Sequence, residues 1–172
     1  QASKITPINN RFQVRNDFLE VTRDTVFRDE PAALMEIYVI IGNREDIYGV
    51  RSATIRLIRK HASSIDENFR NDKEVTRLFL ELLRSKYHLF TQLRRMERYG
   101  ILGAYLPEFE RIIGQMQFDL FHIYTVDAHT LQVVRNMRRF RYKNQEQQFP
   151  IAAHIHHQLP KAELLYIAGL YH

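Results

Sequence analysis

The sequence contains no cysteine among its 172 residues. Disulfide frameworks, thiolate nucleophiles and cysteine-ligated zinc sites are therefore excluded, and the composition fits a cytoplasmic protein. Glycine and proline are also scarce, at six and five residues, which disfavours a loop-rich all-β protein.

Hydrophobic runs long enough to cross a membrane are absent too. The most apolar stretch, Ala32 to Ile41, is interrupted by Glu36 and has about half of the roughly 20 residues that a spanning helix needs. No leader of basic, apolar and small residues opens the chain, and its first residue is Gln1, so we expect the natural start to lie elsewhere. The apolar stretch is predicted to be a buried helix.

The charge balance is mildly basic. Lys and Arg number 25 against 20 Asp and Glu, which gives a formal net charge of +5. The basic residues are spread along amphipathic segments, so nucleic-acid binding is not expected. A hydrophobic content of 45% is sufficient for a core, and the length suits one domain or one domain and part of a second.

The first thirty residues have the pattern of strands. Arg11–Arg15 and Phe18–Thr22 alternate apolar and polar side chains, and Asn16–Asp17 between them are typical turn residues. We predict a small N-terminal β-hairpin, with Val26–Phe27 as a short third extended piece.

Helical periods dominate after residue 30. Pro31 suits the start of a helix that runs to Ile41. Ser52 and Asp72 are the predicted N-caps of the next two helices, because their side-chain oxygens can accept hydrogen bonds from free backbone amides. Gly100 is the predicted stop of a fourth helix, from about residue 88 to residue 99.

The pattern changes beyond residue 100. Gly103 and Pro107 are predicted breaks, and a short helix is expected from about residue 108 to residue 113. Two longer helices follow, from about 126 to 140 and from 161 to 172. The predicted fold is therefore mainly α, a helical bundle with a small N-terminal hairpin. A composition shift divides it into domains at 1–115 and 116–172.

Histidine is the candidate metal ligand in a chain without cysteine. The densest group is His154, His156 and His157. Its spacing fits no strong zinc pattern, so we interpret it as a solvated surface. His122 and His129 are seven residues apart, about two helical turns, with Asp119 and Asp127 nearby, which is a weak signal for a metal site. His172 follows an apolar helix from which a ligand can emerge.

Several sequence stretches resemble one enzyme family. The most specific are Gly114–Thr130, which reads GQMQFDLFHIYTVDAHT, and Leu159–His172, which reads LPKAELLYIAGLYH. Both closely resemble the bifunctional uridylyltransferase/uridylyl-removing enzymes of bacterial nitrogen regulation, which modify the signalling protein PII. Asn10–Phe12, Pro31–Glu36 and Gly100–Pro107 are similar as well, so the resemblance covers essentially the whole chain.

The resemblance implies a layout for the whole enzyme. A nucleotidyltransferase domain transfers UMP from UTP to a tyrosine of PII, and a helical domain follows it. An HD-type phosphohydrolase domain then removes the UMP, and C-terminal ACT domains sense glutamine. This chain matches the helical domain and the first helices of the HD domain. UTP and glutamine are therefore expected to bind outside it, and the chain alone is expected to be inactive.

The resemblance also assigns two metal ligands. HD domains bind a divalent metal through a first histidine, a His-Asp pair and a later Asp, and His129 and His172 match the two histidines. The implied metal is Mg²⁺ or Mn²⁺, which polarises a phosphoryl oxygen and activates water. Two ligands bind such hard cations poorly. The sequence departs from the family at Ala128, Gly169 and Tyr171, where Glu, Ala and Phe are usual, and none of these is a ligand.

Two alternatives to this function stay open. The chain could be a helical protein-interaction module that contacts PII or packs against the transferase domain. It could also be part of another HD-type metal-dependent phosphohydrolase. No phosphate-cradling glycine loop and no Gly-x-Ser-x-Gly elbow points to a further class of enzyme.

Overall fold

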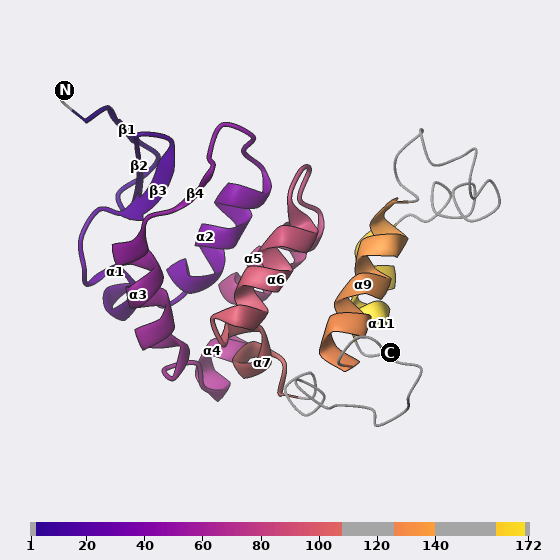
Figure 1. Cartoon of the computed structure of the whole chain (residues 1–172). Coiled ribbons are helices and arrows are strands. Elements are labelled where there is room, and N and C mark those ends of the chain that lie inside the picture. Colours follow the sequence, from indigo (N-terminus) through magenta and orange to yellow (C-terminus); the bar gives the residue numbers. More distant parts are fainter. Residues whose placement is uncertain (1–2, 108–125, 140–160, 171–172) are drawn as a thin grey trace. The chain divides into compact units, whose positions relative to one another are not determined.

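The computed structural model describes residues 3–107, 126–139 and 161–170 (Figure 1). For residues 126–130 it describes the backbone alone. The chain divides into two compact units, residues 1–105 and 106–172. The predicted domain boundary at residues 115 and 116 lies outside the described residues and stays a prediction.

A β-hairpin lies near the N-terminus, as predicted. Strands β2 (Phe12–Arg15) and β3 (Phe18–Val21) pair antiparallel, with Arg15 opposite Phe18. The turn residues Asn16 and Asp17 have φ angles of 48° and 66°. Asn and Asp tolerate this left-handed conformation better than other residues with a side chain, and it matches the twist of a two-residue hairpin.

Two further strands extend the hairpin to a four-stranded sheet of order β1-β2-β3-β4. Strand β1 (Ile5–Pro7) pairs antiparallel with β2, and β4 (Gly49–Val50) pairs parallel with β3. The prediction of a third extended piece at Val26–Phe27 is wrong. These two residues begin helix α1 (Val26–Asp29), and both side chains are buried. Two adjacent apolar residues have no period, so their sequence pattern cannot separate strand from helix.

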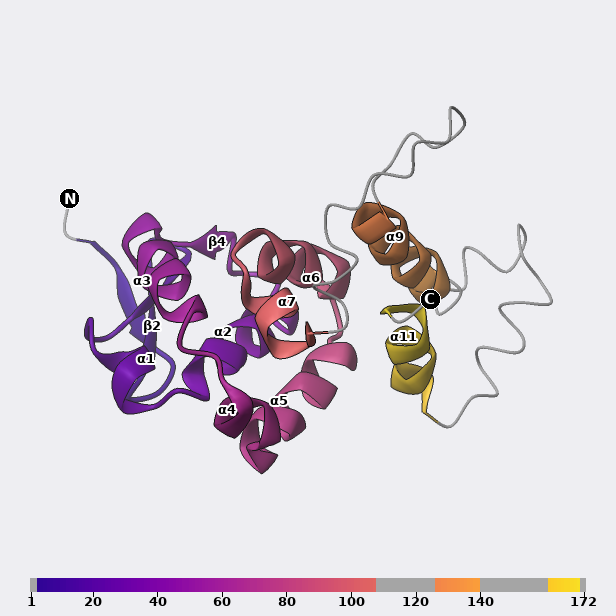
Figure 2. The same cartoon turned by 90° about the horizontal axis from the view of Figure 1, so that it is seen from below.

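Helix α2 (Ala33–Gly42) is the buried helix that the apolar run predicts. Figures 1 and 2 show that it lies in the middle of the unit. The sheet, α1 and α3 are on one side of it, and α5 and α6 are on the other. Its end lies against the turn that follows α5. The carbonyl of Gly42 accepts hydrogen bonds from the amides of Tyr87 and His88. A Cβ added to Gly42 would lie 2.5 Å from Ser85 Oγ, so only glycine fits there without a shift.

Five more helices complete the first unit. They are α3 (Ser52–Ala62), α4 (Glu67–Asn71), α5 (Lys73–Leu83), α6 (Leu89–Arg98) and α7 (Ile101–Tyr105). Asp72 caps α5 as predicted, because its carboxylate accepts from the amides of Glu74 and Val75. Gly100 follows α6 with a φ of +80°, which confirms it as the helix stop.

Two predictions about helix ends are wrong. Ser52 is the first helical residue, and the N-cap position belongs to Arg51, whose side chain makes no capping bond. The Arg51 amide donates to the Leu19 carbonyl at 2.9 Å, so pairing with the sheet decides where the helix begins. Gly103 lies inside α7, where the cost of a helical glycine is about 1 kcal/mol and is offset by its buried neighbours Leu102 and Tyr105.

The described helices of the second unit are α9 (Val126–Arg139) and α11 (Ala162–Leu170). Both match helices that the sequence predicts, and Figures 1 and 2 show them side by side. Leu131, Val134, Tyr166 and Leu170 are buried. The predicted short helix at residues 108–113 lies outside the described residues.

The fold class is thus confirmed as mainly α with a small N-terminal hairpin. Among the described residues, no helix has the length and apolar character needed to cross a membrane.

Candidate functional site

The two predicted metal ligands belong to the second unit. His129 lies in the first turns of α9, where only its backbone is described. His172 lies outside the described residues, and so do the His154, His156 and His157 group and His122. Within the described ranges, no three His, Asp or Glu residues come together as metal ligands. The assignment of His129 and His172 therefore stays a prediction.

The helix that contains His129 is packed closely against α11. A Cβ added to Gly169 of α11 would lie 3.1 Å from Val134 Cγ2 and 3.1 Å from Met137 Sδ, both on α9. Such a contact is tighter than ordinary van der Waals packing, so the absence of a side chain at Gly169 lets the two helices approach. Arg138 of α9 and Glu163 of α11 are also buried, at 5% and 7% exposure. This helix pair would form the scaffold of the predicted metal site.

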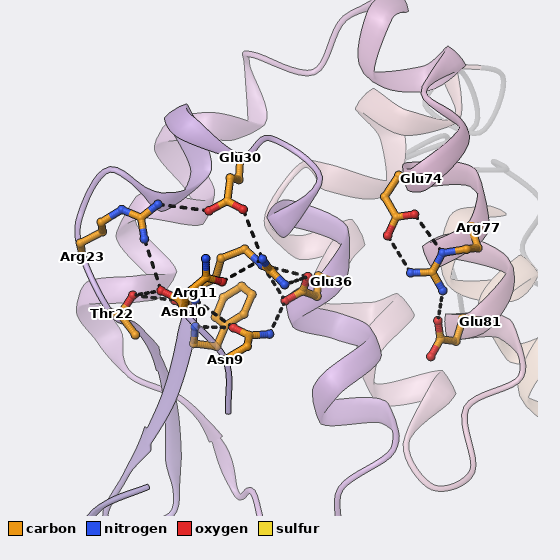
Figure 3. Close-up of polar contacts among 11 residues, drawn as sticks. Asn9, Asn10, Arg11, Thr22, Arg23, Glu30, Glu36, Glu74, Arg77 and Glu81 are labelled. Atoms are coloured by element: carbon orange, nitrogen blue, oxygen red, sulfur yellow. Dashed lines mark hydrogen bonds and ion pairs between the residues drawn. The ribbon is translucent and has the colours of Figure 1, made fainter. Parts of the chain in front are cut away.

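The first unit has a polar cluster where the hairpin meets α2 (Figure 3). Arg11 lies between two carboxylates, with Nη2 3.0 Å from Glu36 Oε2 and Nη1 3.2 Å from Glu30 Oε1. Asn9 donates from Nδ2 to Glu36 Oε1 at 3.0 Å. The hydrogen bond to Glu36 raises the pKa of Arg11, although partial burial opposes the shift. The cluster holds the sheet on α2.

One residue in the sequence points to this cluster. Glu36 is the one charged residue in the apolar stretch from Ala32 to Ile41. A carboxylate on a buried helix needs a partner, because desolvating an unpaired charge is costly. Its partner Arg11 lies 25 residues earlier, which periodicity alone cannot identify.

We expect Arg11→Met to lower the free energy of unfolding by about 1 kcal/mol more than Arg77→Met does. Arg77 is the matched control, since it also lies between two carboxylates, Glu74 and Glu81 (Figure 3). The Arg77 side chain is 58% exposed and its partners share its helix, whereas the Arg11 side chain is 25% exposed and joins separate elements. Urea unfolding of both variants measures the difference, and equal losses would contradict the prediction.

A pocket of about 320 Å³ lies between the segment after α2 and the beginning of α6. Ile41 and Ile47 provide apolar walls, and Thr91 and Arg95 of α6 line it as well. Gln92 also lines the pocket and is fully buried. Its side-chain amide makes no hydrogen bond to any described residue. The pocket therefore combines apolar walls with polar residues such as Thr91 and Arg95, a pattern typical of binding sites.

Comparison with known families gives a match for the first unit. Residues 12–105 match the family described as the uridylyltransferase GlnD third domain. No solved structure matches the chain.

Comparison with individual proteins extends the match to the whole chain. It is 53% identical over 171 residues to a bifunctional uridylyltransferase/uridylyl-removing enzyme of Azotobacter vinelandii. It is 50% identical over 172 residues to that of Ectopseudomonas mendocina. These matches cover 99% and 100% of this chain but 19% of each relative. The chain therefore spans about a fifth of the length of the curated relatives.

Proposed function

Because the chain belongs to the family of bifunctional uridylyltransferase/uridylyl-removing enzymes, we propose that it serves both activities on the regulatory protein PII, in response to glutamine. The identity of 53% over 99% of the chain is the observation on which this proposal depends. The relatives are named as enzymes that transfer and remove uridylyl groups. PII as the target and glutamine as the signal come from the sequence resemblance, and the cytoplasm as the location comes from the absence of cysteine.

The second unit is the proposed beginning of an HD-type hydrolase domain. His129 and His172 would each offer an imidazole nitrogen to Mg²⁺ or Mn²⁺, in the positions that the resemblance assigns to the first two histidines. A metal bound there would supply Lewis-acid polarisation of the phosphoryl oxygen and a water of lowered pKa. The role of this chain is to position the first histidine, through the close packing of α9 against α11 at Gly169.

Two imidazoles alone do not match the preference of Mg²⁺ or Mn²⁺ for several oxygen ligands. The 172-residue chain is therefore expected to release no UMP from uridylylated PII in the presence of Mn²⁺. The measurement is UMP release, with the full-length Azotobacter vinelandii relative as the positive control. Robust turnover by the 172-residue chain would contradict the proposal that His129 and His172 supply only part of the metal site.

A chimera tests whether this chain serves the enzyme as proposed. The 172 residues replace the aligned residues of the Azotobacter vinelandii relative, and both uridylyl transfer and uridylyl removal are measured with PII as substrate. We expect the chimera to retain both activities within about tenfold of the parent enzyme, which corresponds to about 1.4 kcal/mol in the activation barrier. A folded chimera that lacks both activities would refute the proposal.

A further inference from the structure

Two helices of the first unit expose an unusual density of positive charge. The basic residues of α3 and α6 are Arg56, Arg59, Lys60, Arg94, Arg95 and Arg98. Five are exposed and Arg95 is half-buried. The two helices contain one acidic residue between them, Glu97. We call this surface the basic face.

The basic face is not neutralised within the described part of the chain. None of its six cations makes an ion pair with a described carboxylate, which distinguishes it from seven other arginines of the unit. The arginines that do pair are Arg11, Arg15, Arg23, Arg28, Arg44, Arg51 and Arg77. Unpaired charges on neighbouring helices repel one another, so the face gains from an anionic partner.

Aromatic rings hold two of the guanidinium groups in place. Arg59 of α3 lies over the ring of Tyr99, 5.2 Å from its centroid, and Arg94 lies 5.9 Å from the centroid of Phe90. The contact between Arg59 and Tyr99 links the basic residues of α3 to the end of α6. Because each ring already has a guanidinium over it, these aromatics offer little surface for the stacking of nucleic-acid bases.

The basic face continues to the pocket beside α6. Thr91, Arg94, Arg95 and Arg98 share one face of the helix, at spacings of three and four residues, and Thr91 and Arg95 also line the pocket. Tyr48, at 73% exposure, lies at the same pocket. The apolar walls would suit an apolar side chain of a partner better than solvent.

We propose that the basic face docks an acidic polypeptide segment, which places one apolar side chain in the pocket beside α6. Carboxylates of the segment pair with the arginines, whose planar groups suit bidentate bonds to carboxylates. The apolar side chain contacts Ile41 and Ile47 and provides an anchor. Glu45 at the pocket repels any anion there, so the pocket receives the apolar side chain while the carboxylates of the segment lie over the arginines. This inference does not depend on the proposed uridylyl chemistry.

Binding is tested with the 172-residue chain and a fluorescein-labelled peptide of one phenylalanine flanked by three glutamates on each side. Fluorescence anisotropy at low salt is expected to show binding that weakens as salt increases, because exposed charges are screened. The same peptide with serine in place of phenylalanine is expected to bind at least about fivefold more weakly. A peptide with lysines in place of the glutamates is expected not to bind.

Variants locate the site. We expect two double variants, made independently, each to weaken binding by about tenfold or more. One is Arg94→Glu/Arg98→Glu on α6, and the other is Arg56→Glu/Lys60→Glu on α3. Thr91→Trp fills the pocket and is expected to abolish the difference between the phenylalanine and serine peptides. Lys73→Glu on α5 is the matched control, since this exposed charge lies outside the basic face, and it should change affinity by less than about twofold. Circular dichroism verifies that each variant is folded.

Three outcomes would overturn the proposal. The first is no binding of the phenylalanine peptide at about 100 µM protein, a concentration that would detect even a weak specific complex. The second is unchanged binding by both charge-reversal variants. The third is tighter binding of a single-stranded oligonucleotide of equal charge, which would make the face a nucleic-acid surface.

Discussion

Alanine in place of His129 is expected to lower uridylyl removal by the chimera at least about a hundredfold, with uridylyl transfer left near the level of the unsubstituted chimera. His129 is the first of the metal ligands that the HD resemblance assigns. Lewis-acid polarisation by a metal contributes several kcal/mol to hydrolysis, and each 1.36 kcal/mol changes the rate tenfold. The transfer reaction is expected to use acids outside this chain, so it serves as an internal control.

His154→Ala provides the matched control for the loss of an imidazole. His154 belongs to the histidine group that the sequence indicates to be solvated, so its removal should change uridylyl removal by less than about twofold. A Mn²⁺ titration gives a second measurement, since loss of a ligand should raise the metal concentration required for half-maximal activity. Unchanged hydrolysis and an unchanged Mn²⁺ requirement in His129→Ala would exclude His129 as a ligand.

Gly42→Ala is expected to lower the free energy of unfolding by about 2 kcal/mol, because it forces a methyl group into a packed contact. The added Cβ would lie 2.5 Å from Ser85 Oγ and 3.0 Å from Ser85 Cβ. The φ angle of Gly42 is not positive, so alanine has no backbone strain there and its helix propensity alone would favour it. Urea unfolding monitored by circular dichroism measures the loss.

A second substitution identifies the cause of that loss. Ser85→Gly removes the atoms that the new methyl group would meet. Gly42→Ala should therefore lower the free energy of unfolding by less in the Ser85→Gly background. A double-mutant cycle measures the coupling energy between the two positions. Gly49→Ala is the control, since a Cβ at Gly49 would lie 3.4 Å from the Phe18 ring, an ordinary contact. A neutral or stabilising Gly42→Ala would show that α2 and the turn after α5 adjust without cost.

Local sequence patterns predicted the elements that local chemistry determines. The hairpin turn at Asn16 and Asp17, the cap at Asp72 and the stop at Gly100 all depend on the conformational preferences of one or two residues. The start of α3 at Ser52 depends instead on the bond from the Arg51 amide to Leu19 in the sheet. A pairing between distant segments leaves no period in the sequence, so pattern analysis could not find it.

The functional assignments also differ in whether they depend on local sequence or on contacts between distant segments. The family follows from long specific stretches and is confirmed over nearly the whole chain. The metal ligands His129 and His172 depend on side chains from separate helices, and they stay a prediction. The run of Arg94, Arg95 and Arg98 is visible in the sequence as a solvated helix face, but its union with the basic residues of α3 is not. Arg59 and Arg94 are 35 positions apart in the chain, and the contact of Arg59 with Tyr99 at the end of α6 joins their helices only in the folded unit.

The parallel pairing of β3 with β4 has a consequence for the order of folding. It joins Phe18 to Gly49, and helices α1 and α2 lie in the segment between them. Local hairpin formation between β2 and β3 requires only a two-residue turn, whereas β4 can join only after a long loop has closed, which is slow and costs entropy. We therefore expect the hairpin and the individual helices to form early. Pairing of β4 with β3 would then be a late step, after which the native core of the unit is complete.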